Sequence, residues 1–133
     1  MIKLNELVIK LKLEKKVYLL GYQKNVFNYI NNAKCLICPS LYEDPGFVII
    51  EAAFLNKFVL AADSKTGPTE ILKNSERGIL FKNNNYEDLA EKYIEFTNLS
   101  NKELNKKVVN LKKYSKQFTL YNHFKNLKNI FND

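Results

Sequence analysis

Residues 40–51, SLYEDPGFVIIE, carry two carboxylates at the ends of a segment that is otherwise largely apolar. Glu43 precedes a Pro-Gly turn, and Glu51 follows that turn, with seven residues between the two glutamates. Carboxylates accept hydrogen bonds from hydroxyl groups, so the pair could bind a polyhydroxylated molecule. Each position alone also fits a plain structural role, as an acid favoured by the dipole at a helix start or as a solvated helix residue.

The turn between the glutamates offers a place for an anion. Gly46 permits close backbone approach, and the first N–H groups of the helix that follows, at Gly46, Phe47 and Val48, point towards a bound phosphate or diphosphate. Glu43 would repel that phosphate, so it should face a neutral group with hydroxyl donors. Glu51 lies in the second turn of the helix, and its side chain leans back towards the same end. The combination predicts a nucleotide-sugar site.

The elements that must position this site are short apolar strands alternating with helices. Strands are predicted at 17–20, 36–38, 58–62 and 79–81. Helices are predicted at 3–14, around 26–30, from the Pro-Gly turn to about 55, at 69–73 and in three segments from residue 86 to the C-terminus. Wholly apolar strands alternating with helices are typical of a parallel sheet covered on both faces. The predicted fold is a doubly wound, Rossmann-like α/β sheet that begins with a helix, as though its first β-α step were missing.

Three loops should meet at the carboxyl ends of these strands, where open α/β sheets bind ligands. They are residues 21–25 (GYQKN), 39–46 (PSLYEDPG) and 62–68 (ADSKTGP). All three carry glycine, proline or small polar residues, and their convergence is more informative than any one of them.

Residues 17–81 resemble the carboxyl-terminal half of retaining glycosyltransferases with the GT-B fold, in glycosyltransferase family 4 (group 1 type). The segments that carry the resemblance are VYLLGYQKNVFNYI, AKCLICPSLYEDPGFVIIEAAF, FVLAADSKTGPTEIL and ERGILF. They contain a strand ending in Gly, a Pro-Ser pair before the first Glu, the two glutamates followed by Ala, and a Gly-containing loop before Glu-Ile. The resemblance covers about half the chain.

The resemblance implies a role for each matching position. Glu43, the catalytic candidate, would accept hydroxyls of the donor sugar. The remaining donor-binding set is Ser40, the backbone of Gly46, Phe47 and Val48, Glu51 on the ribose, Thr66 and Gly67 on the phosphate side, and Tyr22 and Lys24 beside the base. Many family members have Gly-Gly where Thr66-Gly67 stands, which leaves the donor open, although a UDP-sugar is favoured. The family uses no metal ion and no cofactor, and this form of the motif resembles a subgroup that builds bacterial surface polysaccharides.

The resemblance also implies parts that this sequence does not show. A whole enzyme has an amino-terminal domain that binds the acceptor, and an Arg/Lys pair that neutralises the diphosphate. Residues 1–100 are therefore interpreted as a donor-binding domain incomplete at its start, and 101–133 as basic amphipathic helices that pack on it. The missing domain, in cis or in trans, is an expected partner. Alone, the chain should bind a nucleotide weakly and transfer sugar poorly or not at all.

The charge distribution and the cysteine content argue against two other classes of protein, nucleic-acid binders and zinc proteins. The 133 residues carry a net charge of +7, of which +6 lies after residue 100, so the tail is basic and the body nearly neutral. The body has no basic patch mixed with aromatics, so no nucleic-acid partner is expected. Cys35 and Cys38 lie three residues apart in the apolar segment that contains the predicted strand 36–38, so they should point to opposite faces. With a single histidine in the chain, a four-ligand zinc site cannot be completed.

Two apolar stripes run along the tail: Leu104, Val108, Leu111 and Phe118, and then Leu120, Phe124, Leu127 and Phe131. Such stripes more often bury against protein, here the missing domain, and contact of the lysine-rich face with anionic lipid ranks second. The expected location is the cytoplasm, with peripheral contact on the inner face of the membrane as that second option. Two alternatives stay open: a non-catalytic nucleotide-binding or interaction module built on the same fold, and an unrelated dinucleotide binder, against which the absence of G-x-G-x-x-G counts.

Overall fold

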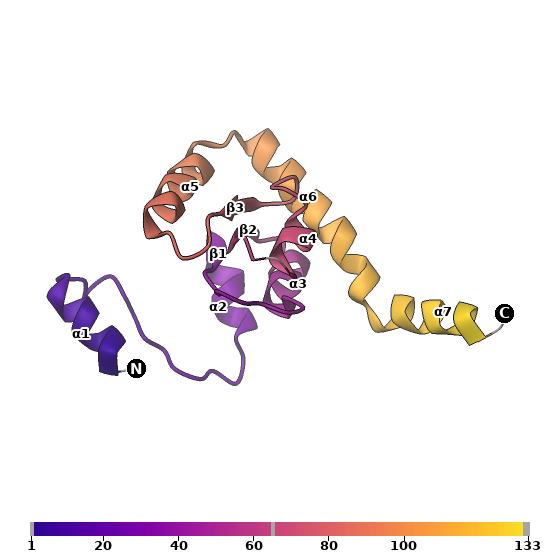
Figure 1. Cartoon of the computed structure of the whole chain (residues 1–133), viewed down its shortest axis with the longest axis horizontal. Coiled ribbons are helices and arrows are strands. Elements are labelled where there is room, and N and C mark those ends of the chain that lie inside the picture. Colours follow the sequence, from indigo (N-terminus) through magenta and orange to yellow (C-terminus); the bar gives the residue numbers. More distant parts are fainter. Residues whose placement is uncertain (1, 65, 132–133) are drawn as a thin grey trace.

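The sheet has three parallel strands in the order β1-β2-β3, and it lies between helices (Figure 1). A computed structural model describes residues 2–64 and 66–131 of the chain. The strands are β1 (Cys35–Cys38), β2 (Phe58–Ala62) and β3 (Ile79–Phe81). Cys35 pairs with Phe58 across β1 and β2, and Leu60 pairs with Ile79 across β2 and β3. The doubly wound fold class is confirmed.

The helices before and between the strands are α1 (Ile2–Lys10), α2 (Phe27–Asn32), α3 (Phe47–Phe54) and α4 (Pro68–Leu72). After β3 come α5 (Tyr86–Asn98), α6 (Asn101–Ser115), the 3-10 helix η1 (Lys116–Phe118) and α7 (Leu120–Phe131). For α1 to α4 the predicted bounds differ from the observed ones by at most four residues. No helix within the described parts of the chain has the length and apolar character needed to span a bilayer.

Central strand β2 divides the core between the two faces of the sheet. All five of its residues are buried. Val59 and Ala61 join a cluster formed mainly by α3 and α4, whereas Phe58, Leu60 and Ala62 join a cluster with β3 and α5. Alternate residues of a strand point to opposite faces, so a wholly apolar strand needs cover on both. The core therefore explains why the sequence alternates strands with helices.

Helix α6 closes the core and ties the basic tail to the body. Its Leu111 is buried in the first cluster and its Val108 in the second. Lys107 Nζ donates to the carbonyls of Ser75 and Gly78 in the turn before β3. The helix is therefore part of the α/β body, and it begins with a capping box formed by a serine and a glutamate.

The predicted strand at 17–20 is wrong for this chain. Within the described residues, 17–20 belong to no strand, and their side chains are 37–72% exposed. An extended segment needs a neighbouring strand to satisfy its backbone groups and bury its side chains. None is available there, so the apolar pattern alone does not produce a strand.

The two terminal helices extend from opposite sides of the body (Figure 1). On α1, Leu4, Leu7 and Ile9 are exposed. On α7, six large apolar side chains are 39–84% exposed: Leu120, Tyr121, Phe124, Leu127, Ile130 and Phe131. The second tail stripe is thus uncovered along its whole length, whereas the first stripe is largely packed.

Candidate functional site

The start of α3 has the backbone geometry that an anion site needs. Gly46 is the residue before the helix; it is buried and left-handed, with φ 82°. A Cβ at this position would lie 3.1 Å from Ile71 Cδ1, so both the backbone angle and the close packing favour glycine. The N–H groups of Phe47 and Val48 follow directly and lack partners within the helix. The Phe47 side chain is 59% exposed, so the first turn is accessible.

The loop after β2 packs directly on the loop that carries Glu43. Gly67 has φ 62°, and a Cβ there would lie 2.6 Å from the Glu43 carbonyl oxygen and 3.3 Å from the Pro45 carbonyl oxygen. Thr66 Oγ1 donates to the same Glu43 carbonyl at 3.3 Å. Two loops that are far apart in the sequence therefore meet at one peptide group beside the start of α3.

A network of side-chain hydrogen bonds shapes the loop after β2. Thr69 Oγ1 lies 2.8 Å from Asp63 Oδ1 and also bonds the Ser64 carbonyl. Ser64 Oγ donates to the Thr66 carbonyl at 3.0 Å, and the Asp63 N–H donates to the Phe81 carbonyl at 2.7 Å. These hydrogen bonds join residues within the loop and tie the loop to β3. They therefore fix the conformation in which Gly67 contacts the Glu43 carbonyl.

The two glutamates are both half-buried. Glu43 lies in the loop before α3, and Glu51 lies one helical turn after Phe47, on the same face of α3. Neither takes part in the two ion pairs found among the described residues, Lys73–Glu76 and Lys92–Glu95. Their carboxylates therefore remain able to accept hydrogen bonds from a ligand.

Ser40 is held at the end of β1. It is half-buried, and its Oγ lies 3.6 Å from Cys38 Sγ. Ser40 lies in the loop after β1, so it is at the carboxyl ends of the strands, as Glu43 is.

Tyr22 and Lys24 lie elsewhere, in the exposed segment before α2. Tyr22 is 92% exposed, so its ring packs on neither of the two loops. Gln23, between them, is tied to the Leu20 carbonyl at 2.8 Å and to the Tyr29 hydroxyl at 3.1 Å. The structure therefore brings Thr66 and Gly67 against the loop of Glu43 and Gly46. Tyr22 and Lys24 lie in a separate exposed segment.

Asn83 is a site-shaping residue that the sequence analysis missed. It follows β3, and its Nδ2 donates to the Leu41 carbonyl at 2.8 Å, so it fastens the Glu43 loop from a third element. Its Oδ1 is buried and has no hydrogen-bond partner among the described residues. The sequence feature that could have indicated this role is an asparagine just past the carboxyl end of a strand, where side chains reach neighbouring loops.

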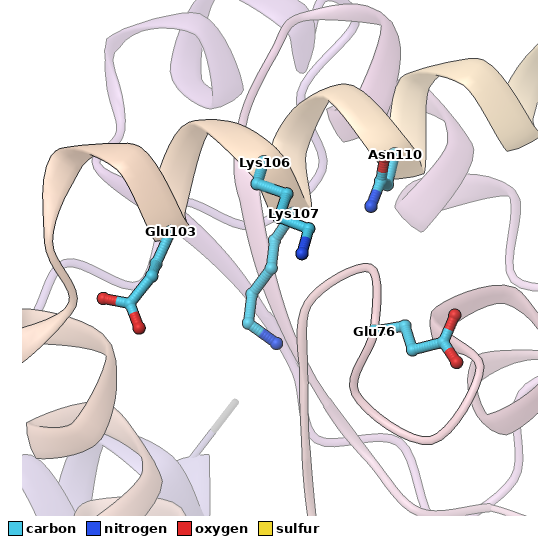
Figure 2. A pocket seen from close by; sticks show the side chains of 5 residues that line it. All are labelled: Glu76, Glu103, Lys106, Lys107 and Asn110. Atoms are coloured by element: carbon cyan, nitrogen blue, oxygen red, sulfur yellow. The ribbon is translucent and has the colours of Figure 1, made fainter.

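Two hollows outside this junction help to delimit the site. One, of about 340 Å³, lies between α6 and the turn before β3 and is lined by Glu76, Glu103, Lys106, Lys107 and Asn110 (Figure 2). That turn enters β3 at its amino end, the end opposite to the Glu43 loop. A second hollow, of about 400 Å³, is lined by Phe47 together with residues of η1 and α7, so it borders the start of α3.

Comparison with known sequences places almost the whole chain in one family. Residues 2–128 match the family described as glycosyl transferases group 1. An uncharacterized glycosyltransferase of Methanocaldococcus jannaschii is 49% identical over 70 residues, which are 53% of this chain and 17% of that protein. The poly(ribitol-phosphate) α-N-acetylglucosaminyltransferase of Staphylococcus aureus is 30% identical over 96 residues, 72% of this chain and 20% of that protein. The chain thus spans about a fifth of these relatives.

Solved structures share the fold. A glycosyltransferase from Rickettsia africae matches with a TM-score of 0.85 at 25% identity, covering 97% of this chain and 35% of that one. Anabaena HepE in complex with UDP-glucose matches with a TM-score of 0.76 at 23% identity, over 86% of this chain and 31% of that one. The C-terminal domain of a group 1 glycosyltransferase from Francisella tularensis matches with a TM-score of 0.72 at 21% identity, over 90% of this chain and 60% of that domain.

These matches confirm the family predicted from the two-glutamate segment and its neighbours. They also confirm that the chain has the Rossmann-like fold of the carboxyl-terminal domain of GT-B glycosyltransferases. This chain belongs to the group 1 glycosyltransferases.

Proposed function

We propose that this chain is the donor-binding part of a retaining glycosyltransferase, which takes its sugar from a nucleotide-diphosphate sugar. The observation that carries the proposal is the junction at the Glu43 carbonyl. There Thr66 and Gly67 bring the loop after β2 against the loop before α3. The junction stands beside the first N–H groups of α3, and two half-buried glutamates belong to the same region: Glu43 in the loop before α3 and Glu51 one turn into it.

In this arrangement each part of the donor has a partner of fitting chemistry. The N–H groups of Phe47 and Val48 would donate to the diphosphate, with the positive end of the α3 dipole behind them. Glu51 would accept from the ribose hydroxyls, and Glu43 from the hydroxyls of the sugar. As the family resemblance implies, the proposal gives the site no metal ion and no resident cofactor.

Relatives support this class of donor and suggest an acceptor. HepE was solved with UDP-glucose, and the S. aureus relative is named for N-acetylglucosaminyl transfer to poly(ribitol phosphate). A Campylobacter jejuni relative, 32% identical over 74 residues, is named for N-acetylgalactosaminyl transfer to a diphospho-undecaprenol sugar. We therefore propose a UDP-sugar donor and a glycan or lipid-linked acceptor, in the synthesis of a bacterial surface polysaccharide. That work would take place in the cytoplasm, with contact between the basic tail and anionic lipid as a secondary proposal.

Calorimetric titration with UDP, GDP and their sugars tests the donor site. We expect Glu51→Gln to weaken UDP binding by about tenfold or more, because a hydrogen bond to a charged group contributes about 1.5–3 kcal/mol. Glu91→Gln is the matched control, since Glu91 is an exposed residue of α5. The proposal fails if no nucleotide binds at millimolar concentration, or if Glu51→Gln binds as the unchanged protein does.

A second candidate is a non-catalytic nucleotide-binding or interaction module with the same site. The exposure of Phe47 favours it, because transfer needs a cleft closed against water and this helix start is open. The two candidates separate when the chain is supplied with the amino-terminal part of a relative and a UDP-sugar. Transfer to an acceptor, with the anomeric configuration of the donor kept, supports the enzyme; binding without turnover supports the module.

A further inference from the structure

We propose that a groove along α6, at the amino ends of the strands, binds an anionic glycan chain at a second place, away from the donor site. The chain would carry repeated phosphate or carboxylate groups. The choice of a glycan rests on the proposed function, because that function needs a glycan or lipid-linked acceptor. The groove and its charges do not depend on it, and no nucleotide takes part.

The groove consists of two hollows that share Glu76 and Asn110. One has a volume of about 340 Å³ and the other of about 400 Å³. Figure 2 shows the first hollow, with side chains of α6 on one side and the turn that carries Glu76 on the other. The second hollow extends further along α6, as far as Lys113 and Tyr114. A long ligand could therefore lie between α6 and this turn.

Cationic side chains outnumber the carboxylates in the groove, and both carboxylates are already bonded. Glu76 Oε2 lies 3.0 Å from Lys73 Nζ, and Glu103 Oε2 accepts from the backbone and the hydroxyl of the serine that begins α6. Lys106 and Lys113 are exposed, and they take part in neither ion pair found among the described residues. The four cations of the lining are Arg77, Lys106, Lys107 and Lys113.

Arg77, the one arginine of the sequence, is held in place beside these lysines. Its guanidinium carbon lies 3.8 Å from the centre of the Tyr114 ring, and its Nη1 donates to the Ile71 carbonyl at 3.0 Å. A guanidinium has five N–H donors, so donors remain beyond the one used here. An arginine fixed in this way loses little freedom when it binds a phosphate or carboxylate through two parallel hydrogen bonds.

The turn opposite α6 has an unusual backbone. Residues 73–75 are all left-handed, with φ 46°, 49° and 69°, and residues other than glycine seldom adopt this conformation. Lys107 Nζ holds the turn through the carbonyls of Ser75 and Gly78, and Ser75 Oγ accepts from the Leu80 N–H at 2.9 Å. Residues kept in such conformations cluster at ligand sites. This wall of the groove is therefore shaped before a ligand arrives.

The spacing of the charges fits a chain better than a single anion. Lys106 and Lys113 lie two turns apart on one face of α6, about 10 Å along the helix axis, so one phosphate cannot contact both. The groove is at the amino ends of the strands, and the five residues of β2 span about 16 Å. Only an extended molecule could occupy the groove and also reach the donor site at the other end.

Two other anionic partners fit the groove less well. Single-stranded nucleic acids bind by stacking their bases on aromatic rings, but the Tyr114 ring is covered by Arg77 and packs edge-on against Phe118. A bilayer surface would contact charges that protrude, whereas these charges line a hollow. A single flexible chain meets both conditions.

Fluorescence anisotropy with labelled poly(ribitol phosphate) and labelled polygalacturonate tests the inference on the full chain. We expect at least one of the two polymers to bind, and added salt to weaken the binding because it screens exposed charges. Lys106→Gln combined with Lys113→Gln should weaken it about tenfold or more, because two charge-assisted contacts are lost. Arg77→Lys should also weaken it, since that change keeps the charge but removes the planar fork.

The matched control is Lys125→Gln combined with Lys128→Gln, which removes two charges from α7 and should leave polymer binding nearly unchanged. Circular dichroism checks that each variant folds. Glu51→Gln should bind the polymer as the unchanged chain does, so a failure of this inference and a failure of the donor site are distinguishable.

Four outcomes would overturn the inference. The first is that neither polymer binds at low salt. The second is that the control pair weakens binding as much as the groove pair, which would assign binding to the overall charge of the tail. The third is displacement by inorganic phosphate at an equal concentration of phosphate groups, which would indicate a single-anion site. The fourth is equally tight binding of a single-stranded oligonucleotide or of phosphatidylglycerol vesicles, lost in the same groove variants.

Discussion

At the scale of single residues, the Glu43 loop is held by contacts that come from outside it. Thr66 and Gly67 approach from the turn before α4, and Asn83 approaches from the turn after β3. A flexible loop would lose conformational entropy on binding a sugar, and these contacts remove part of that cost before the ligand arrives. If the site binds the donor sugar as proposed, its affinity for that sugar should depend on Thr66, Gly67 and Asn83, although none of them is expected to contact it.

Asn83→Asp tests this dependence. The change keeps the shape of the side chain but replaces the Nδ2 donor with an acceptor that faces the Leu41 carbonyl. Leaving that carbonyl unpaired beside a carboxylate costs about 1–3 kcal/mol, so we expect binding of UDP-glucose to weaken about tenfold. UDP lacks the sugar that Glu43 would face, so its affinity should change little. Calorimetry with both ligands measures the ratio.

The matched control is Asn105→Asp, the same change at an exposed position of α6. An equal loss of affinity for UDP and UDP-glucose would mean that Asn83 only stabilises the fold, and no loss for either would mean that the loop is set by other contacts.

How far the sequence predicts this site depends on which residues act through local chemistry. The Pro-Gly turn and the two glutamates could be placed because helix starts and loop ends have local signals. Gly67 was expected to shape the phosphate side, but its contact with the Glu43 carbonyl is tertiary and no spacing rule predicts it. The bond from Asn83 was missed for the same reason, since it joins residues 42 positions apart.

At the scale of elements, α6 begins with a well-formed capping box. Ser100 Oγ accepts from the Glu103 N–H at 3.3 Å and donates to Glu103 Oε2 at 2.5 Å, while the Ser100 N–H donates to the same carboxylate at 3.1 Å. These hydrogen bonds hold the pKa of the Glu103 carboxyl below its usual range. The start of α6 is thus stabilised by the ionised form of that side chain.

The pH dependence of unfolding checks this effect. Because the folded-state pKa of Glu103 is depressed, its contribution is present above the unfolded-state pKa and is lost as pH falls through the folded-state pKa. We expect Glu103→Gln to unfold more readily than the unchanged chain at neutral pH. The difference should shrink in acid as Glu103 becomes protonated. Urea titrations across that pH range measure it, and a difference that stays constant with pH would contradict the assignment.

Elements also show where pattern reasoning fails. The sequences of β2, β3 and α3 are sufficient to locate them, because each packs on elements present in the chain. Residues 17–20 have an equally apolar sequence and form no strand, because a strand is a property of a pair. An apolar pattern predicts that a segment will be buried, but whether the segment forms a strand depends on a neighbouring strand with which it can pair.

At the scale of the whole molecule, stability should fall from the centre of the sheet towards both ends of the chain. β2 has a paired strand on each side and five buried residues, whereas α1, residues 17–26 and α7 are largely exposed. Local opening is easiest where few apolar contacts are lost. We therefore expect high local stability in the α/β body and low local stability in the terminal segments.

Hydrogen exchange followed by mass spectrometry tests this gradient. Amides of β2 should exchange only through global unfolding, and amides of α1 and α7 should exchange faster by orders of magnitude. Leu60→Ala, which removes a fully buried side chain, should speed exchange in β2 and leave that of α7 unchanged. Protection of α7 comparable to that of β2 would contradict this division.

The close approach of Gly67 to the Glu43 carbonyl has a consequence for attempts to change the sugar that the proposed donor site would accept. Because no side chain fits between the two loops, neither can alter its path without the other. Grafting residues 39–46 from a relative with a different donor should yield a misfitted junction, whereas moving 39–46 and 63–69 together should keep it. Donor specificity in this fold would then be transferable only by exchanging the two loops together, although α3 and β2 separate them in the sequence.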